Sequence, residues 1–346
     1  RWLFKWSWRI RIMSDLKINN ITNRIGDTGP VIAGVSTVSS SAFMVMPTGN
    51  TEIRGSGSGR AIVFVGATPS AVTTIDAFNT ATSGNAFDFG EASAARYNNG
   101  HGGCASGTRG VIADGTAIEY VIFSSSGGSN DFGDHRLMGG GTGTAAIGHA
   151  ANGVRGLLAG GYIAPANLST IDYINIATTG STNLFGEFND GSTGGYFPMA
   201  SPTRAVFGRA RQGLNYINFT SGGKTEIFGN MRSDSRTGHI ASASNSTRGI
   251  MGGGEAPSRV NTITYITLAT LGDGIDFGDL TTVRNDQDAV SSSTRAFFTA
   301  GHNGSAITNL IDFVTISTTG NASDFGDLTQ ARSQPSSCSD VHGGLG

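Results

Sequence analysis

The sequence of 346 residues predicts an all-β fold, a six-bladed β-propeller. The first observation is a Phe-Gly pair that recurs six times, at intervals of 43 to 53 residues, a period typical of propeller blades. The second is that each repeat holds several short strand patterns and no helical pattern. The third is that an extra strand pattern follows the last repeat. The six Phe residues of these pairs are Phe89, Phe132, Phe185, Phe228, Phe277 and Phe325.

The sequence of a repeat predicts four strands, and the last repeat serves as the example. A polar, small-residue strand, "DAVSSST" at 288–294, comes before "RAFFTAG" at 295–301, which begins with Arg. A strand with alternating side chains follows, "IDFVTIS" at 311–317, and in this strand of each repeat both alternating faces are apolar or nearly so, as expected for a sheet packed on both sides. The turn "TTGN" at 318–321 then leads into the Phe-Gly strand. We expect each repeat to be one antiparallel blade with a small-residue inner strand and an exposed outer rim.

The two ends of the repeat region predict how the ring closes. The first repeat begins directly at the strand from Arg60 and lacks the polar strand before it. The chain carries a surplus polar strand, "QPSSCSD" at 334–340, after the sixth Phe-Gly pair. A C-terminal strand that completes the first blade would leave no open sheet edge between the ends. The propeller is therefore expected to span 57–346.

Composition excludes several classes of protein. With 53 Gly but only 14% charged residues, the chain is neither collagen-like nor a charged disordered polymer. A formal charge of −2 with three Lys gives no basic footprint, so we expect no nucleic-acid partner. No apolar run reaches about 18 residues, so we expect no membrane span. Cys104 and Cys338 are too few for a disulfide framework, and we expect small buried residues, with a bridge between them as the alternative.

Residues 1–56 differ from the repeats. The segment 1–12, "RWLFKWSWRIRI", holds all three Trp and lacks the plan of a signal peptide, so we interpret it as a non-native extension before Met13. A Trp- and Arg-based membrane-surface anchor is the alternative. Residues 13–56 form a head that contains two short apolar strand patterns around "SSS". Because two strands alone are not stable, this hairpin either packs on the propeller or docks onto a partner or a second copy of the chain.

The repeats resemble those of known families. A Gly-Gly strand, a strand of the "IDYINIA" kind, a turn and an Arg before the next strand resemble the kelch plan, with Phe-Gly where kelch repeats place Trp. The closer resemblance is to propeller-bearing structural proteins of tailed bacteriophages. It rests on "GNASDFGDLT" at 320–329, on the head "INNITNRIGDTGPVIAGVSTVSSSAFMVMPTGNTE" at 18–52 and on "DVHGGLG" at 340–346.

This resemblance implies a non-enzymatic structural or accessory protein of the virion. It implies that residues 13–56 dock onto other virion proteins or onto copies of the same chain. The propeller would then present a surface for binding, for example to a host-surface glycan. The alternatives are a cellular kelch-like protein-interaction module and, third, a glycan-active enzyme.

Candidate catalytic and metal-binding residues are scattered, so we expect no enzyme site, no metal and no cofactor. His101, His149 and His239 lie at different distances before their Arg strands and should not share a metal. Acidic residues after five of the six Phe-Gly pairs supply too few oxygens for calcium. We expect these acids to accept hydrogen bonds from turn amides or from the repeated Arg residues, which are Arg60, Arg109, Arg155, Arg204, Arg248 and Arg295.

A binding site is expected where the repeat is broken. The third, fifth and sixth repeats have long connections after the Gly-Gly strand, and the segment 189–199 shares their face. Aromatic rings that stack on a sugar, with a few polar groups, are typical of glycan sites. We predict that Tyr196 is exposed there, whereas Phe197 is either exposed or buried at the start of an inner strand. The candidate ligand-binding residues are Tyr162, Asn167, Tyr196, Phe197, Glu255, Arg259, His302 and Asn303.

Overall fold

The structure is a computed structural model that describes residues 59–96, 102–114, 117–136, 147–163, 166–189, 196–209, 213–232, 239–255 and 257–340. The chain divides into a unit of residues 1–49 and a unit of residues 50–346. The predicted extension at 1–12 and the predicted head at 13–56 lie outside the described residues.

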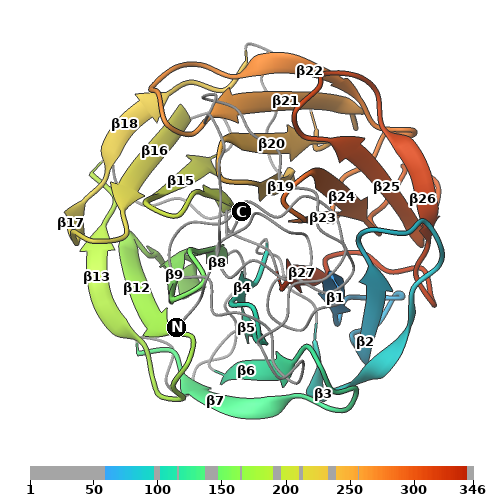
Figure 1. Cartoon of the computed structure of the whole chain (residues 1–346), viewed down its shortest axis with the longest axis horizontal. Helices are drawn as coiled ribbons and strands as arrows, with labels where there is room; N and C mark the ends of the chain where they lie inside the picture. Colours follow the sequence, from blue (N-terminus) through green and yellow to red (C-terminus); the bar gives the residue numbers. More distant parts are fainter. Residues whose placement is uncertain are drawn as a thin grey trace, which may run out of the picture. The chain divides into compact units, whose positions relative to one another are not determined.

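The described residues form six small β-sheets arranged as the blades of a propeller, which confirms the predicted fold (Figure 1). From the inner to the outer strand, blade 1 contains β27 (Ser336–Ser339), β1 (Arg60–Phe64), β2 (Val72–Asn79) and β3 (Phe87–Arg96). Blade 2 contains β4 (Cys104–Ala105), β5 (Arg109–Asp114), β6 (Ala117–Ile122) and β7 (Asn130–Asp134). Blade 3 contains β8 (Ile147–Ala151), β9 (Arg155–Gly160), β12 (Thr170–Asn175) and β13 (Asn183–Glu187).

The remaining blades follow the same antiparallel plan. Blade 4 contains β14 (Tyr196–Ala200), β15 (Arg204–Arg209), β16 (Gly213–Asn218) and β18 (Glu226–Gly229). Blade 5 contains β19 (Ala241–Ser244), β20 (Arg248–Gly252), β21 (Thr262–Thr267) and β22 (Ile275–Asp279). Blade 6 contains β23 (Asp288–Ser291), β24 (Arg295–Thr299), β25 (Leu310–Thr315) and β26 (Ser323–Asp327). Blade 3 also has a small hairpin, β10 (Tyr162–Ile163) with β11 (Ala166–Asn167), and β17 (Gly223–Lys224) pairs in parallel with β13.

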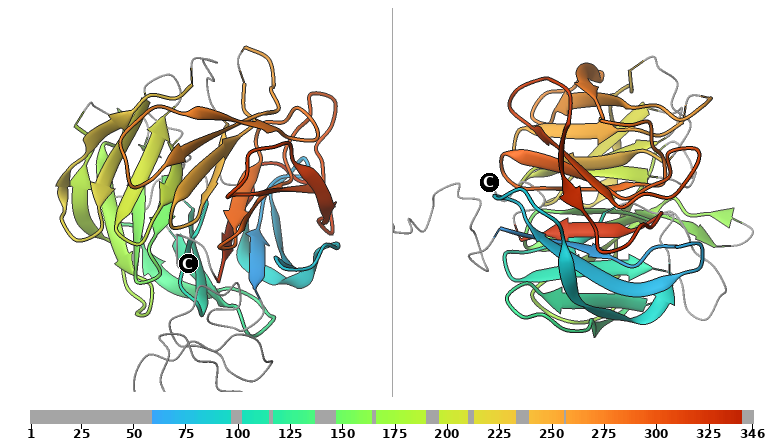
Figure 2. Two further views of the ribbon diagram at one scale, coloured as in Figure 1. Left: turned by 45° about the horizontal axis from the view of Figure 1, so that its top comes forward. Right: turned by 90° about the vertical axis from the view of Figure 1, so that its right-hand side faces the viewer.

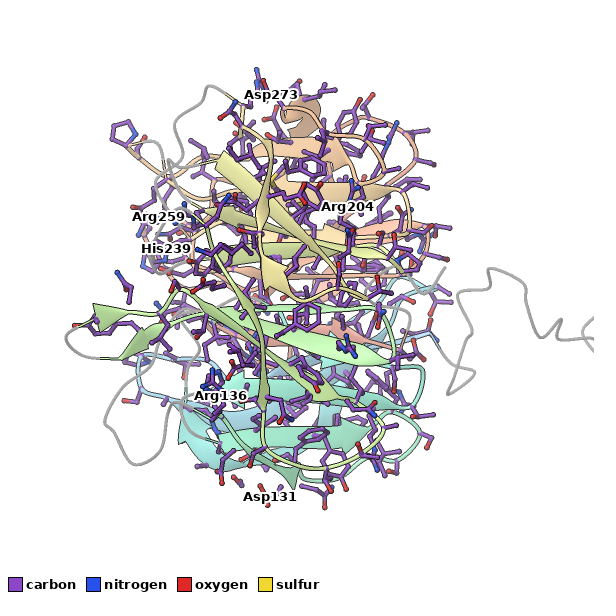
Figure 3. The ribbon with its side chains drawn as sticks, turned by 90° about the vertical axis from the view of Figure 1, so that its left-hand side faces the viewer. Asp131, Arg136, Arg204, His239, Arg259 and Asp273 are labelled. Atoms are coloured by element: carbon purple, nitrogen blue, oxygen red, sulfur yellow. The ribbon has the colours of Figure 1, made fainter. Side chains whose placement is uncertain are left out.

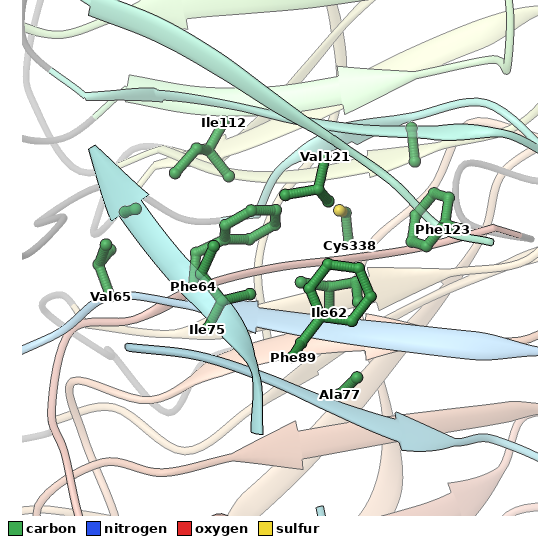
Figure 4. Close-up of a cluster of buried hydrophobic side chains, with 12 residues drawn as sticks. Ile62, Phe64, Val65, Ile75, Ala77, Phe89, Ile112, Val121, Phe123 and Cys338 are labelled. Carbon is green, nitrogen blue, oxygen red and sulfur yellow. The ribbon is translucent and has the colours of Figure 1, made fainter. Parts of the chain in front are cut away.

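The hydrophobic core lies between neighbouring blades, because both faces of each sheet are apolar. Between blades 1 and 2, for example, Phe64 and Ile75 pack in one buried cluster with Ile112 and Phe123 (Figure 4). Cys338 of β27 lies in the same cluster. Burial on both sides explains why the strands do not show a simple alternation of one apolar and one polar face.

The predicted closure of the ring is confirmed. β27 pairs antiparallel with β1, with Phe64 opposite Ser336 and Ala61 opposite Ser339, so the C-terminal strand is the inner strand of the first blade. The Ser339 hydroxyl also donates to the Ser291 carbonyl of blade 6, at 2.5 Å. Small side chains on the inner strands permit this close approach of neighbouring blades.

The Phe-Gly pair is the place where each blade receives the turn of the next blade. Gly90 has φ of +154°, and a Cβ there would lie 2.0 Å from the Gly127 carbonyl oxygen in the turn of blade 2. The Gly127 amide donates to the Phe89 carbonyl at 2.8 Å. Gly84 of blade 1 docks in the same way on the Phe325 carbonyl of blade 6, at 3.0 Å. Glycine is therefore required, and the docked turns cover part of each outer edge strand.

The six repeated Arg side chains tie each blade to its neighbour. Each donates a hydrogen bond from Nη1 to a backbone carbonyl of the following blade, as Arg204 does to Leu268 at 3.0 Å and Arg295 to Thr80 at 3.2 Å. Each guanidinium also lies over an aromatic ring of its own blade, as Arg248 does over Tyr265 at 4.6 Å. The acids after Phe-Gly were expected to bind either turn amides or these Arg. The second of these predictions is wrong, because the hydrogen bonds of the Arg go to backbone carbonyls. A carbonyl at the end of the neighbouring strand is the nearer acceptor.

A second set of interblade contacts pairs a buried acid with a different Arg. Asp76 in β2 binds Arg332, which follows the outer strand of blade 6, and both side chains are fully buried. Asp312 in β25 binds Arg284 in the same way, at 2.6 Å. Glu119 and Asp172 form the corresponding pairs with Arg96 and Arg136. Blades 4 and 5 carry Asn215 and Thr264 instead, so these two blades lack the acid.

Asp288, the first residue of β23, connects three blades at the ring closure. Its Oδ1 accepts a hydrogen bond from the Gly102 amide of blade 2, at 3.0 Å, and Ser337 of blade 1 also donates to its carboxylate. Oδ2 is buried and has no hydrogen-bond partner in the described part of the chain. Burial raises the pKa of Asp288 from 3.8 to about 7.

We expect Asp288 to make the stability of the propeller depend on pH. The folded state keeps this proton up to about pH 7, whereas the unfolded chain releases it near 3.8, so unfolding is favoured increasingly as pH rises between these values. A tenfold change in proton affinity corresponds to about 1.4 kcal/mol, so the full effect is on the order of 4 kcal/mol. The melting temperature of Asp288→Asn should therefore exceed that of the parent chain by a margin that grows as pH rises from 4 to 8. A difference in melting temperature that stays constant over this range would contradict the assignment.

Candidate functional site

The propeller has two faces with different connections. One face, called the loop face here, carries the connections between the second and third strands of each blade and those that lead from one blade to the next. The opposite face, called the turn face, carries the turns between the third and fourth strands. The repeat is regular on the turn face, and its irregular connections all lie on the loop face.

A polar network spans blades 5 and 6 on the loop face. Asn285 lies at its centre and is 3% exposed. Its Nδ2 donates to Glu255 Oε1 at 2.7 Å, and its Oδ1 accepts from Arg259 Nε at 2.7 Å. Glu255 and Arg259 face each other across the connection after β20. Because Arg259 uses only Nε here, its other N–H groups have no acceptor among the residues that the structure describes.

His302 extends the network into the sixth blade. Its amide donates to the Asn285 carbonyl at 2.8 Å, and the Asn285 amide donates back to the His302 carbonyl at 3.2 Å. His302 Nδ1 accepts from the Gly304 amide at 2.9 Å, so a neutral ring carries its proton on Nε2. Asn303 accepts from the Ser305 and Ala306 amides and shapes the turn. The predicted residues Glu255, Arg259 and His302 therefore come together.

A His–Asp pair lies beside this network. His239 Nδ1 lies 2.5 Å from Asp286 Oδ1, and the His239 side chain is 46% exposed. The hydrogen bond to Asp286 raises the pKa of His239, with Glu255 contributing and Arg259 opposing. Figure 3 shows His239 and Arg259 close together on the loop face.

The backbone is strained at these two residues. His239 and Asp286 have φ of +57° and +53°, and Gln334, at the matching place before β27, has φ of +54°. Non-glycine residues in this conformation are uncommon and cluster at functional sites. The Gln334 amide donates to the Asp286 carbonyl at 2.7 Å, so three consecutive blades are linked here.

Tyr162 and Asn167 form a separate group. They are opposite each other in the β10–β11 hairpin of blade 3, and both are exposed. This hairpin, pale green in the right-hand view of Figure 2, projects beyond the rest of its blade. Blade 4 stands between this hairpin and the network of blades 5 and 6, so the two groups do not form one continuous contact.

Two predicted aromatic residues are not on the surface. Tyr196 and Phe197 belong to the inner strand β14 and are 0% and 1% exposed. The Tyr196 ring stacks on Phe188 at 4.4 Å, and Phe197 fills the space left by Gly208, whose Cβ would lie 1.8 Å from the ring. The prediction of Tyr196 as an exposed sugar-stacking residue is therefore wrong. Tyr196 packs in the buried cluster between blades 3 and 4 and Phe197 in the cluster between blades 4 and 5, because neighbouring residues of a strand point to opposite faces of the sheet.

Three residues of the site were missed as ligand-binding candidates, namely His239, Asn285 and Asp286. His239 was considered only as a metal ligand. Asn285 and Asp286 lie in "RNDQD" at 284–288, a polar connection between two blades. The one usable signal was that blade 5 is followed by this charged sequence, whereas blade 6 is followed by "RSQPS" at 332–336.

The side chains of this network can donate and accept hydrogen bonds and so can bind polar groups. No group of three or more His, Cys, Asp or Glu that could hold a metal occurs in the residues described. Cys104 and Cys338 are both free and buried, and burial raises the pKa of Cys104 to about 12, so its thiol is a poor nucleophile. No described helix is long and apolar enough to cross a membrane.

The described unit thus belongs to the class of six-bladed β-propellers. No protein-family model matches the chain, and no curated protein matches it. The site has to be interpreted from its own geometry.

Proposed function

We propose that this chain is a non-enzymatic structural or accessory protein of a bacteriophage particle. Its propeller binds a host-surface glycan through the loop face of blades 5 and 6. The likeness of "GNASDFGDLT" and of the head sequence to phage structural proteins supports the virion location. The same likeness supports docking of residues 13–56 onto other virion proteins or onto copies of the chain.

The observation that carries the binding proposal is the network of Glu255, Asn285 and Arg259 with the adjacent His239–Asp286 pair. The six repeated Arg residues and the buried acids of blades 1, 2, 3 and 6 are used in contacts between blades. Among the described residues this network occurs once, and it is partly exposed. It combines a carboxylate, a guanidinium and an imidazole, which can donate to and accept from sugar hydroxyls. A single asymmetric polar site suits one ligand.

The test is binding of the full chain to an array of purified bacterial envelope polysaccharides. Arg259→Ala should lower binding about tenfold or more, because a hydrogen bond to a charged group contributes about 1.5–3 kcal/mol. The substitution also leaves the buried Asn285 Oδ1 without this donor, which should cost about 1–3 kcal/mol of stability, so binding is measured well below the melting temperature of the variant. Tyr162→Ala, in the separate hairpin, is the control and should bind as the parent chain does.

Three outcomes would overturn the proposal. They are the absence of binding to every polysaccharide, unchanged binding by Arg259→Ala, and binding that depends on Tyr162 instead. Release of reducing sugar from a bound polysaccharide would show a glycan-active enzyme. Selective capture of a protein partner with no glycan binding would favour the kelch-like interaction module.

A further inference from the structure

The turn face of blade 3 contains a pocket with a volume of about 370 Å³. It is lined by Val154 and Arg155 at the start of β9 and by Tyr173 to Asn175 of β12. The turn from Thr178 to Asn183 supplies the rest of the lining. A pocket of this size is at the lower end of the range for small-molecule sites. It lies on the opposite face from the network of blades 5 and 6.

Arg155 is held in place at this pocket. Its Nη1 donates to the Phe219 carbonyl of blade 4 at 2.6 Å. Its guanidinium lies over the rings of Tyr173 and Phe185, at 4.8 and 5.3 Å from their centres. No other acceptor for the Arg155 guanidinium occurs among the described residues. A fixed planar guanidinium with spare donors suits a carboxylate, because ordering it on binding costs little.

The rest of the lining is neutral and rich in hydroxyl and amide groups. Asn175, Thr178, Thr179, Ser181 and Asn183 are all exposed. No acidic side chain lines the pocket. Val154, 68% exposed, adds an apolar wall. The combination of one cation, several hydrogen-bonding groups and an apolar wall matches a sugar that carries a carboxylate.

The equivalent place in blade 5 has the same framework with different chemistry. Arg248 lies over Tyr265 at 4.6 Å and donates to the Ile316 carbonyl at 2.9 Å, as Arg155 does in blade 3. Asp273 stands in that turn where blade 3 has Ser181, and it accepts from the Asn230 amide at 2.8 Å. A carboxylate in the turn would repel an anionic ligand. Blade 5 therefore provides a matched control.

From these contacts we propose that the pocket on the turn face of blade 3 binds a uronic-acid unit of an acidic polysaccharide. Arg155 bonds the carboxylate, and the side chains of Asn175, Thr179 and Asn183 bond the hydroxyls. This site is independent of the loop-face network, so either one can fail without the other.

The experiment is calorimetric titration of the full chain with an oligogalacturonate, and with a neutral oligoglucan of equal length. The parent chain should bind the oligogalacturonate and not the oligoglucan, with an affinity that falls as salt is added. Arg155→Gln should lower that affinity about tenfold or more. Arg248→Gln removes the same type of interblade hydrogen bond in blade 5. It should lower the melting temperature by the same amount and leave the affinity for the oligogalacturonate unchanged.

A second pair of variants covers the case in which Arg155→Gln does not fold. Asn183→Ala should weaken oligogalacturonate binding, and Asn130→Ala, at the matching place in blade 2, should not. Asn130 and Asn183 are both exposed first residues of outer strands, so neither change should disturb the fold. Equal losses of oligogalacturonate binding within either pair of variants, equal binding of the neutral oligomer, or no binding by the parent chain would each overturn the proposal.

Discussion

Deletion of residues 333–346 should abolish the cooperative folding of the propeller. β27 supplies the inner strand of blade 1, and its loss would leave one edge of β1 without a partner from Ala61 to Phe64, while the other edge stays paired with β2. Cys338 would be lost from the buried cluster between blades 1 and 2. Unpaired edge strands pair with other chains, so the truncated chain should aggregate. Circular dichroism with heating should show no sharp transition, and soluble yield should fall severely.

The control for this deletion is removal of residues 341–346 alone, which keeps β27. This shorter deletion should melt like the parent chain. A cooperative transition at the parent temperature in the longer deletion would contradict the closure by β27.

Asp76→Ala should lower the free energy of unfolding by about 3–5 kcal/mol, because it leaves the buried Arg332 guanidinium without its counter-charge. The Asp76 carboxylate also accepts from the Thr329 amide at 3.0 Å and the Thr329 hydroxyl at 2.7 Å. These bonds join blade 6 to blade 1. Urea denaturation followed by far-ultraviolet circular dichroism measures the change in the free energy of unfolding.

The matched control is Asp276→Ala in blade 5. Asp276 pairs with Arg232, but the two side chains are 61% and 41% exposed. An exposed pair contributes about 0–1 kcal/mol. Equal losses in the free energy of unfolding for the two substitutions would show that the buried Asp76–Arg332 pair does not stabilise the contact between blades 6 and 1.

Much of the fold could be predicted because the same sequence pattern recurs in every blade. The alternating strand, the turn and the Phe-Gly pair recur with the same spacing between them, and local patterns of this kind determine strands and turns. The missing first strand and the surplus last strand determined how the ring closes. These inferences need only the order of features along the chain.

The partners of charged residues could not be predicted in this way. The acids that follow Phe-Gly were expected to accept hydrogen bonds from turn amides or from the repeated Arg, whereas the Arg bind carbonyl groups of the next blade. The buried acids of the third strands bind other Arg residues, which follow the outer strand of the preceding blade. Each partner belongs to a different repeat, so its identity depends on how neighbouring sheets stack.

The sequence by itself determined the class of fold, the number of blades and the face on which the repeat is broken. Only the tertiary structure decided which of the candidate residues meet: Glu255, Arg259 and His302 join through Asn285, Tyr162 and Asn167 stand apart, and Tyr196 is buried. The physical reason is that strand patterns arise from contacts within a blade, which are local in the chain. Site geometry arises from contacts between blades, where packing volume selects which side chains are covered.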